Sequence, residues 1–153
     1  MADASTAQQT ADAVGAHLFA NDRASKAMGM RIVAISEGAA FLEMKVRDDM
    51  LNGFDICHGG FITTLADSAF AFACNSTGEM TVAAGLTVDF LAPARRGDVL
   101  TARAFELVQQ GRAGFYDITV TNQRGEQVAM VRGRAHRMKD RRVLPADGVG
   151  AKR

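Results

Sequence analysis

The sequence predicts an α+β domain in which a curved antiparallel sheet wraps around one long central helix. Residues 59–76 form an apolar run at helical spacing in which Asp67 is the only formally charged residue, so this helix should be buried on nearly all sides. Around it lie several runs with the period of β-strands, joined by short turns that contain glycine. One helix and one sheet of this kind pack as two layers.

The elements follow in chain order. We expect an N-terminal helix over residues 7–28, where Val14, Leu18 and Phe19 form a modest apolar stripe. The strand-like runs cover residues 30–35, 41–47, 81–91, 99–108, 115–121 and 126–138. In the run 81–91, the alternation predicts that Val82, Leu86, Val88 and Phe90 share one face. The turns at 110–111 and 123–125 predict antiparallel hairpins.

A chain of 153 residues forms one domain that can bury roughly 68–70% of its unfolded surface. We place a single domain at residues 1–138 and expect 139–153 to be a flexible basic tail. The net charge of +1 gives no reason to expect binding to nucleic acid or to a membrane surface. No apolar run approaches the ~18–20 residues that span a bilayer.

Cysteine and histidine usage is sparse. Cys57 and Cys74 do not make a disulfide framework, and we interpret both as small packing residues. The start of the chain lacks the apolar segment of a signal peptide, so we expect a cytoplasmic protein. His17 and His136 are isolated, and no metal site is predicted.

A pair of glycines at the start of the central helix is the first candidate for chemistry. Gly59 and Gly60 lack a Cβ, so a ligand can approach the backbone closely. The first amides of a helix have no intrahelical acceptor and lie at the positive end of its dipole. They are therefore suited to an oxygen that becomes negative during a reaction. Asn52 and His58, just upstream, are candidates for further hydrogen bonds.

Asp67 is the candidate base or nucleophile. It lies off the stripe formed by Phe61, Leu65 and Phe72, on a face of small residues that leaves room for a ligand or a neighbouring chain. A lone carboxylate on a buried helix is also a candidate for a perturbed pKa. Structural alternatives stay open: an isolated Asp can be solvated, His58 can be a helix cap, and two glycines can form an ordinary turn.

Basic residues gather near the end of the chain. Arg134 and Arg137 are candidate phosphate ligands, because the guanidinium group offers a planar fork of donors. A solvated strand face is the alternative interpretation. Arg95 and Arg96, beside Pro93, are similar candidates.

Further motifs run in unbroken order from about Asn21 to Met138. They are Asn21-Asp22, Met28-Gly29, 52–60 with 65–67, 71–76, 88–91 with Pro93, Gly97-Asp98 and 133–137. This set resembles the phenylacetate-degradation (PaaI) family of hotdog-fold acyl-CoA thioesterases. A His-Gly-Gly motif with a later Asp is shared by many hotdog thioesterases, whereas the whole set is much more specific. The resemblance implies the hotdog fold.

The resemblance also implies an assembly and a division of roles. Such proteins form dimers with a continuous sheet, usually paired into homotetramers, and their sites lie at the dimer interface. The Gly59 N–H would polarise the thioester carbonyl, and Asp67 from the other subunit would act as general base or nucleophile. Asn52 and His58 would orient the carbonyl or the attacking water. Coenzyme A would be part of the acyl-CoA substrate, and no cofactor is expected.

Some relatives use a hydroxyl residue on the strand after the helix to assist the water. Here that stretch reads Val82-Ala83-Ala84-Gly85, so this helper is either missing or supplied elsewhere, with Thr63 and Thr64 as the candidates. We also expect the N-terminal helix to cover part of the site, with Asn21 near the substrate. The expected substrate-binding residues are Gly60, Thr63, Thr64, Asn21, Arg134 and Arg137.

The resemblance suggests phenylacetyl-CoA or its ring-hydroxylated forms as substrates. Phe61, Phe70, Phe72 and Phe90 are candidates to line an aryl pocket, although we interpret each as a core residue. Three alternative functions remain open. They are a non-hydrolytic acyl-CoA-binding protein, a hotdog enoyl-CoA hydratase or dehydratase centred on a histidine, and a purely structural oligomer.

Overall fold

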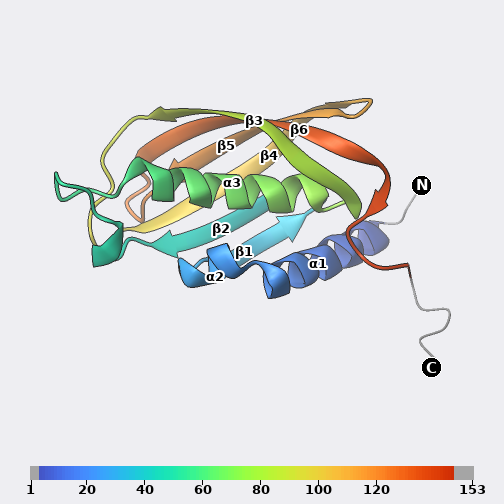
Figure 1. Cartoon of the computed structure of the whole chain (residues 1–153), viewed down its shortest axis with the longest axis horizontal. Coiled ribbons are helices and arrows are strands. Elements are labelled where there is room, and N and C mark those ends of the chain that lie inside the picture. The colour runs from blue at the N-terminus through green and yellow to red at the C-terminus, as the bar shows by residue number, and fades with distance from the viewer. Residues whose placement is uncertain (1–3, 147–153) are drawn as a thin grey trace.

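The computed structural model describes residues 4–146 and has the predicted two layers. A six-stranded antiparallel sheet curves around α3 (Gly59–Asn75), with α1 and α2 beside the β1 edge (Figure 1). The strands are β1 (Arg31–Ser36), β2 (Ala39–Lys45), β3 (Glu79–Phe90), β4 (Val99–Gln110), β5 (Ala113–Thr121) and β6 (Gln127–Arg142). Their order across the sheet is β1-β2-β4-β5-β6-β3, so β1 and β3 are the edges. A 3-10 turn at Asp48–Met50 leads toward α3.

The core lies between α3 and the concave face of the sheet. Leu65, Phe70 and Phe72 of the helix are buried against inward-facing side chains of the strands. Phe70 meets Tyr116 edge to face, with ring centroids 5.3 Å apart. The Tyr116 hydroxyl donates to Glu106 Oε2 at 2.7 Å, which satisfies the one polar atom of this buried ring.

The N-terminal helix expected over residues 7–28 is wrong as one element. The structure has α1 (Ala4–Asn21) and a short α2 (Arg23–Ala27), separated at Asp22. The Asp22 carboxylate accepts hydrogen bonds from the Ser25 amide at 2.9 Å and from the Ser25 hydroxyl at 2.6 Å. An Asp in this position starts a new helix because it caps free amides. Ser25 also shares a 2.9 Å hydrogen bond with Ser68, which ties α2 to α3.

The expected common face of Val82 with Leu86, Val88 and Phe90 is also wrong. The pairing of β3 with β6 shifts register between Ala83 and Gly85. One extra residue in a strand reverses the face of every side chain before it. Val82 is therefore 43% exposed, while Leu86 and Val88 pack against the core.

The last strand extends beyond the boundary placed at residue 138. β6 continues to Arg142, and the Val143 amide then donates to the Gly78 carbonyl. Residues 147–153, the remainder of the expected tail, lie outside the described residues. Between residues 4 and 146, none of the helices has the length and apolar character needed to cross a membrane.

Replacing Gly133 by alanine should destabilise the fold. A Cβ at Gly133 would lie 2.9–3.0 Å from three atoms of the fully buried Phe70 ring. Overpacking of this kind costs about 1–3 kcal/mol, which urea denaturation can measure. Gly53→Ala is the matched control, because nothing lies within 4 Å of its added Cβ. Equal stability of the two variants would contradict the packing argument.

Candidate active site

The first amide of α3 has no partner within residues 4–146. His58 is the N-cap, and its Nδ1 accepts a hydrogen bond from the Gly60 amide at 3.1 Å. The Phe61 amide donates to the His58 carbonyl at 3.0 Å. The Gly59 N–H has no acceptor within the described part of the chain. A free donor at the positive end of a 17-residue helix can bind a partially negative oxygen.

His58 therefore has the capping role that the sequence left open. Because Nδ1 accepts from a backbone amide, the neutral ring carries its proton on Nε2. His58 can then offer a hydrogen bond through Nε2, but in this state it is a donor rather than a base. This arrangement does not favour the hydratase alternative, which needs a histidine base.

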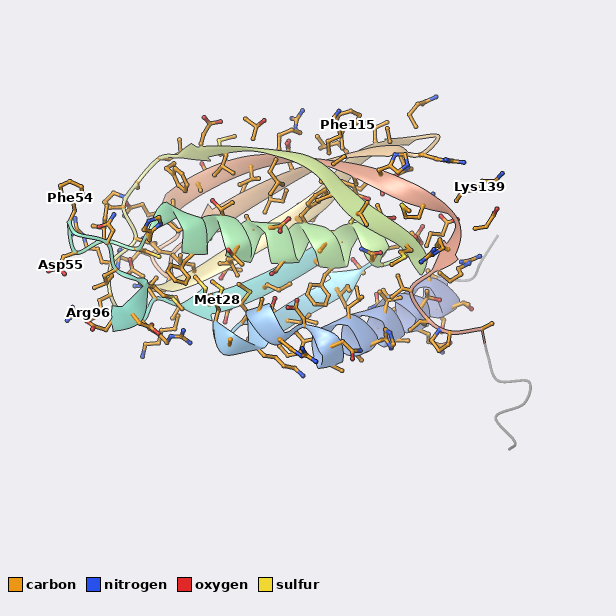
Figure 2. The ribbon with its side chains drawn as sticks, viewed as in Figure 1. Met28, Phe54, Asp55, Arg96, Phe115 and Lys139 are labelled. Atoms are coloured by element: carbon orange, nitrogen blue, oxygen red, sulfur yellow. The ribbon has the colours of Figure 1, made fainter. Side chains whose placement is uncertain are left out.

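Asn52 organises the loop in front of the helix. Its Oδ1 accepts from the Phe54 amide at 2.9 Å and from the Ile56 amide at 3.4 Å. The side-chain oxygen thus fixes the turn, as Asn often does. Its Nδ2 has no acceptor among residues 4–146 and remains a second free donor. Phe54 and Asp55 lie at the loop tip and point away from the domain (Figure 2), where Phe54 is 86% exposed.

An apolar cavity of about 540 Å³ begins at these two donors. Its walls come from the loop before α3, the first turn of α3 and the segment after β3. The lining residues are Asn52, Ile56, Cys57, Gly59, Ile62, Phe90, Leu91, Ala92, Pro93 and Ala94. None carries a formal charge, and the volume lies in the usual range for small-molecule sites.

Asp67 lies elsewhere on α3. It is half-buried, has no hydrogen-bond partner within the described residues, and its pKa is raised because burial disfavours the charged carboxylate. Eight positions separate it from Gly59, which is about 12 Å along a helix axis. Asp67 is not among the residues that line the apolar cavity.

The two candidate threonines lie between Gly59 and Asp67. Thr63 Oγ1 donates to the Gly59 carbonyl and Thr64 Oγ1 donates to the Gly60 carbonyl, each at 2.8 Å. Both hydroxyl protons are thus used within the helix. The hydroxyl oxygens can still accept a hydrogen bond from water.

The remaining candidates are not brought to this cavity. Arg134 is exposed, and its Nη2 donates to the Ala84 carbonyl at 3.1 Å. Arg137 pairs with Glu79 at 2.7 Å and lines a separate cavity beyond the other end of α3. Asn21 is exposed at the end of α1, where its side-chain amide donates to the His17 carbonyl at 2.9 Å.

Both cysteines are buried, as expected for packing residues. Burial raises the pKa of Cys57 to about 11 and that of Cys74 to about 12. Each thiol is therefore protonated at neutral pH, and a cysteine nucleophile is disfavoured.

Sequence reasoning underestimated Phe90. Phe70 and Phe72 are core residues as interpreted, and Phe61 packs partly buried against the core. Phe90 is 55% exposed and lines the cavity beside Gly59. The signal that could have identified Phe90 is the alternation of inward residues Leu86 and Val88 along β3. It continues to Phe90, where the strand passes the first residue of α3.

Comparison with known proteins identifies close relatives. The model of the Thioesterase superfamily matches residues 54–129. The chain is 46% identical to acyl-coenzyme A thioesterase PaaI of Escherichia coli over 121 residues, which cover 79% of this chain and 86% of that protein.

Solved structures agree with this relationship. The E. coli PaaI structure, from the phenylacetic acid degradation operon, superposes with a TM-score of 0.84 at 44% identity and covers 86% of this chain and 95% of that chain. A Streptococcus mutans protein bound to acetyl CoA has a TM-score of 0.69 at 27% identity, over 71% of this chain and 88% of that one. The predicted hotdog fold is thereby confirmed.

Replacing Asp67 by asparagine should raise the free energy of unfolding at pH 7. The unfolded carboxyl has a pKa of about 3.9, whereas burial raises the folded value. The folded state then holds the proton to higher pH, so the carboxylate weakens folding as pH rises from the unfolded pKa through the folded one. Asparagine carries no charge and avoids this loss.

Denaturant unfolding across the acid range and at pH 7 tests this prediction. The two proteins should converge below the unfolded pKa and separate above the folded one. Asp89→Asn, which removes an exposed carboxylate from β3, is the control and should change little. A less stable Asp67→Asn variant at pH 7 would contradict the expectation.

Proposed function

The chain belongs to the PaaI family of hotdog-fold acyl-CoA thioesterases, and on that premise we propose that it hydrolyses aryl-acetyl-CoA thioesters. Phenylacetyl-CoA or its ring-hydroxylated forms would be converted to the free acid and CoA. The observation that carries the proposal is the unpaired Gly59 N–H at the mouth of an uncharged, apolar cavity. The polar carbonyl and the apolar acyl group of a thioester match these two features.

The Gly59 amide would polarise the thioester carbonyl. As a nucleophile adds to the carbonyl carbon, negative charge develops on the oxygen, and a fixed donor stabilises it more than it stabilises the ground state. Removing one such donor typically slows catalysis by 10²–10³-fold. The free Nδ2 of Asn52 lines the same cavity and can donate a second hydrogen bond.

The carboxylate would come from a second copy of the chain. A base must lie within hydrogen-bond reach of the attacking water, and that water must contact the carbonyl carbon. The separation of about 12 Å between Gly59 and Asp67 within one helix is too long for this. Two copies with antiparallel α3 helices would place each Asp67 near the other copy's Gly59.

The edge strand β3 supports this pairing. It has 12 residues, and β6 is its one neighbouring strand within residues 4–146; the Asn75 side chain pairs with the Thr81 backbone near its start. Val82, Ala83 and Ala84 are exposed along it and carry no charge that would discourage pairing. The uncharged middle of this edge is suited to adding another strand, and a two-fold axis would join two β3 strands antiparallel.

Two mechanisms fit Asp67. As a general base, it takes a proton from water while the water oxygen adds to the carbonyl carbon, and the CoA thiolate then leaves. As a nucleophile, its oxygen attacks the carbon and expels the thiolate, and water then hydrolyses the resulting anhydride. A single turnover in H₂¹⁸O separates them, because the label enters Asp67 when water attacks the aspartyl carbon of an anhydride. Label found only in the acid product excludes attack at the aspartyl carbon and agrees with the general base.

Asp67→Asn should lower kcat for phenylacetyl-CoA by about 10²–10⁴-fold, because asparagine can neither accept the proton nor attack the carbonyl. Thiol release measures the rate, and the exposed Asp89→Asn is the control that should retain wild-type activity. Acyl-CoA binding without hydrolysis by the wild-type protein would instead support a binding protein. Equal rates in wild type and Asp67→Asn would remove Asp67 from the mechanism.

A mixture of two inactive variants should recover activity if each site uses both copies. Gly59→Pro removes the amide hydrogen at the first helical position, where proline fits the backbone, and His58 has a ψ of 132° that suits the residue before proline. Its Cβ would also meet the Phe90 ring, so circular dichroism must show that the variant is folded. Refolded together with Asp67→Asn, it should give roughly a quarter of wild-type activity, since half the dimers are mixed and each has one intact site. No recovery in a mixture of confirmed dimers would contradict a shared site.

A further inference from the structure

We propose that Phe90 is a specificity-determining residue of this site, and that its ring favours acyl groups that carry an aromatic ring. This inference rests on the proposed hydrolysis and adds to it the wall of the cavity that selects the acyl group. The sequence makes Phe90 one of four phenylalanines that could line an aryl pocket, but we interpreted each of them as a core residue.

The tip of the Phe90 ring lies directly against Gly59. A Cβ built on Gly59 would be 2.7 Å from Cζ and 3.2 Å from both Cε atoms of this ring. Distances below 3.0 Å do not occur between real atoms of this kind, so only glycine fits beneath the ring as it stands. The residue that offers the free amide is therefore in contact with an aromatic side chain.

Phe90 has this place because β3 extends past the start of α3. Leu86 and Val88 point inward and pack against the core. Phe90 is the next inward position. The helix residue that it meets is Gly59, which has no side chain to cover the ring. The ring consequently remains 55% exposed, unlike Phe70, which is fully buried. A large aromatic side chain left half-exposed beside a cavity is typical of a ligand-binding wall.

The remaining walls define what the cavity accepts. Ile56, Ile62 and residues 91–94 are apolar, and Asn52 provides the one side-chain amide of the lining. A carbonyl oxygen on the Gly59 amide would place the acyl group beside Phe90. An aromatic acyl group can then meet the Phe90 ring edge to face or offset, which a linear alkyl chain cannot do.

Phe90→Leu tests this inference, because leucine keeps the apolar wall and removes the ring. The measurement is the ratio of kcat/KM for phenylacetyl-CoA to that for hexanoyl-CoA, followed by thiol release. We expect the ratio to fall about 3- to 10-fold, the worth of one aromatic pair. Phe105→Leu is the control: Phe105 is 48% exposed on β4, away from this cavity, and the ratio should not change.

A second pair of variants tests the contact itself. Gly59→Ala keeps the amide hydrogen but collides with the ring, so kcat/KM should fall at least about tenfold. In a Phe90→Ala background the collision is gone, and the same Gly59→Ala change should cost little. An equal loss in both backgrounds, or an unchanged substrate ratio in Phe90→Leu, would overturn the role of Phe90.

The outcomes separate this inference from the proposed function. Hydrolysis by the wild-type protein with an unchanged ratio in Phe90→Leu would overturn the inference alone. A wild-type protein that hydrolyses no acyl-CoA would overturn the proposed function and this inference with it. Circular dichroism and the unfolding midpoint of each variant show that the rates are compared between folded proteins.

Discussion

The burial of α3 in the curved sheet is the constraint on which the rest of the structure depends. The helix contributes nine buried residues, and a large apolar side chain removed from water stabilises a fold by about 1.5–3 kcal/mol. This packing fixes the helix axis against the inner strands. Once the axis is fixed, so are its first amide at Gly59 and its carboxylate at Asp67.

At the mouth of the cavity, some polar atoms hold the local backbone in place while neighbouring polar atoms have no partner in the described chain. His58 caps α3 through Gly60, and Gly59 keeps its amide unpaired. Asn52 folds its loop through Oδ1, and Nδ2 keeps its donors. Unsatisfied donors are costly when buried, but here they open into a cavity that water or a ligand can reach. The helix cap and the loop turn that shape this region therefore also position the two free donors.

The sequence was sufficient for the elements whose signal is local. The central helix, expected over 59–76, ends at Asn75, because a charge-poor run bounded by glycines has few other structures available. The break at Asp22, the register shift near Gly85 and the place of Phe90 were missed. The first depends on a side-chain cap, the second on one unpaired residue, and the third on where β3 passes the start of α3. Hydrophobic periodicity does not report such contacts, so it cannot predict these three features. It also cannot predict that Arg137 lies at a different cavity from Gly59.

Assembly and catalysis would be linked by the geometry of one helix. The face of α3 that carries Asp67 is only partly covered by its own chain, and the outer side of β3 has no neighbouring strand within residues 4–146. One second copy would cover that face and pair with β3. The two copies would then share one sheet, and each would bring its Asp67 to the Gly59 of the other. The raised pKa of Asp67 shows that the carboxylate is held at a cost to folding. A role in the proposed shared site would account for a carboxylate at this position, whereas the stability of a single chain would not.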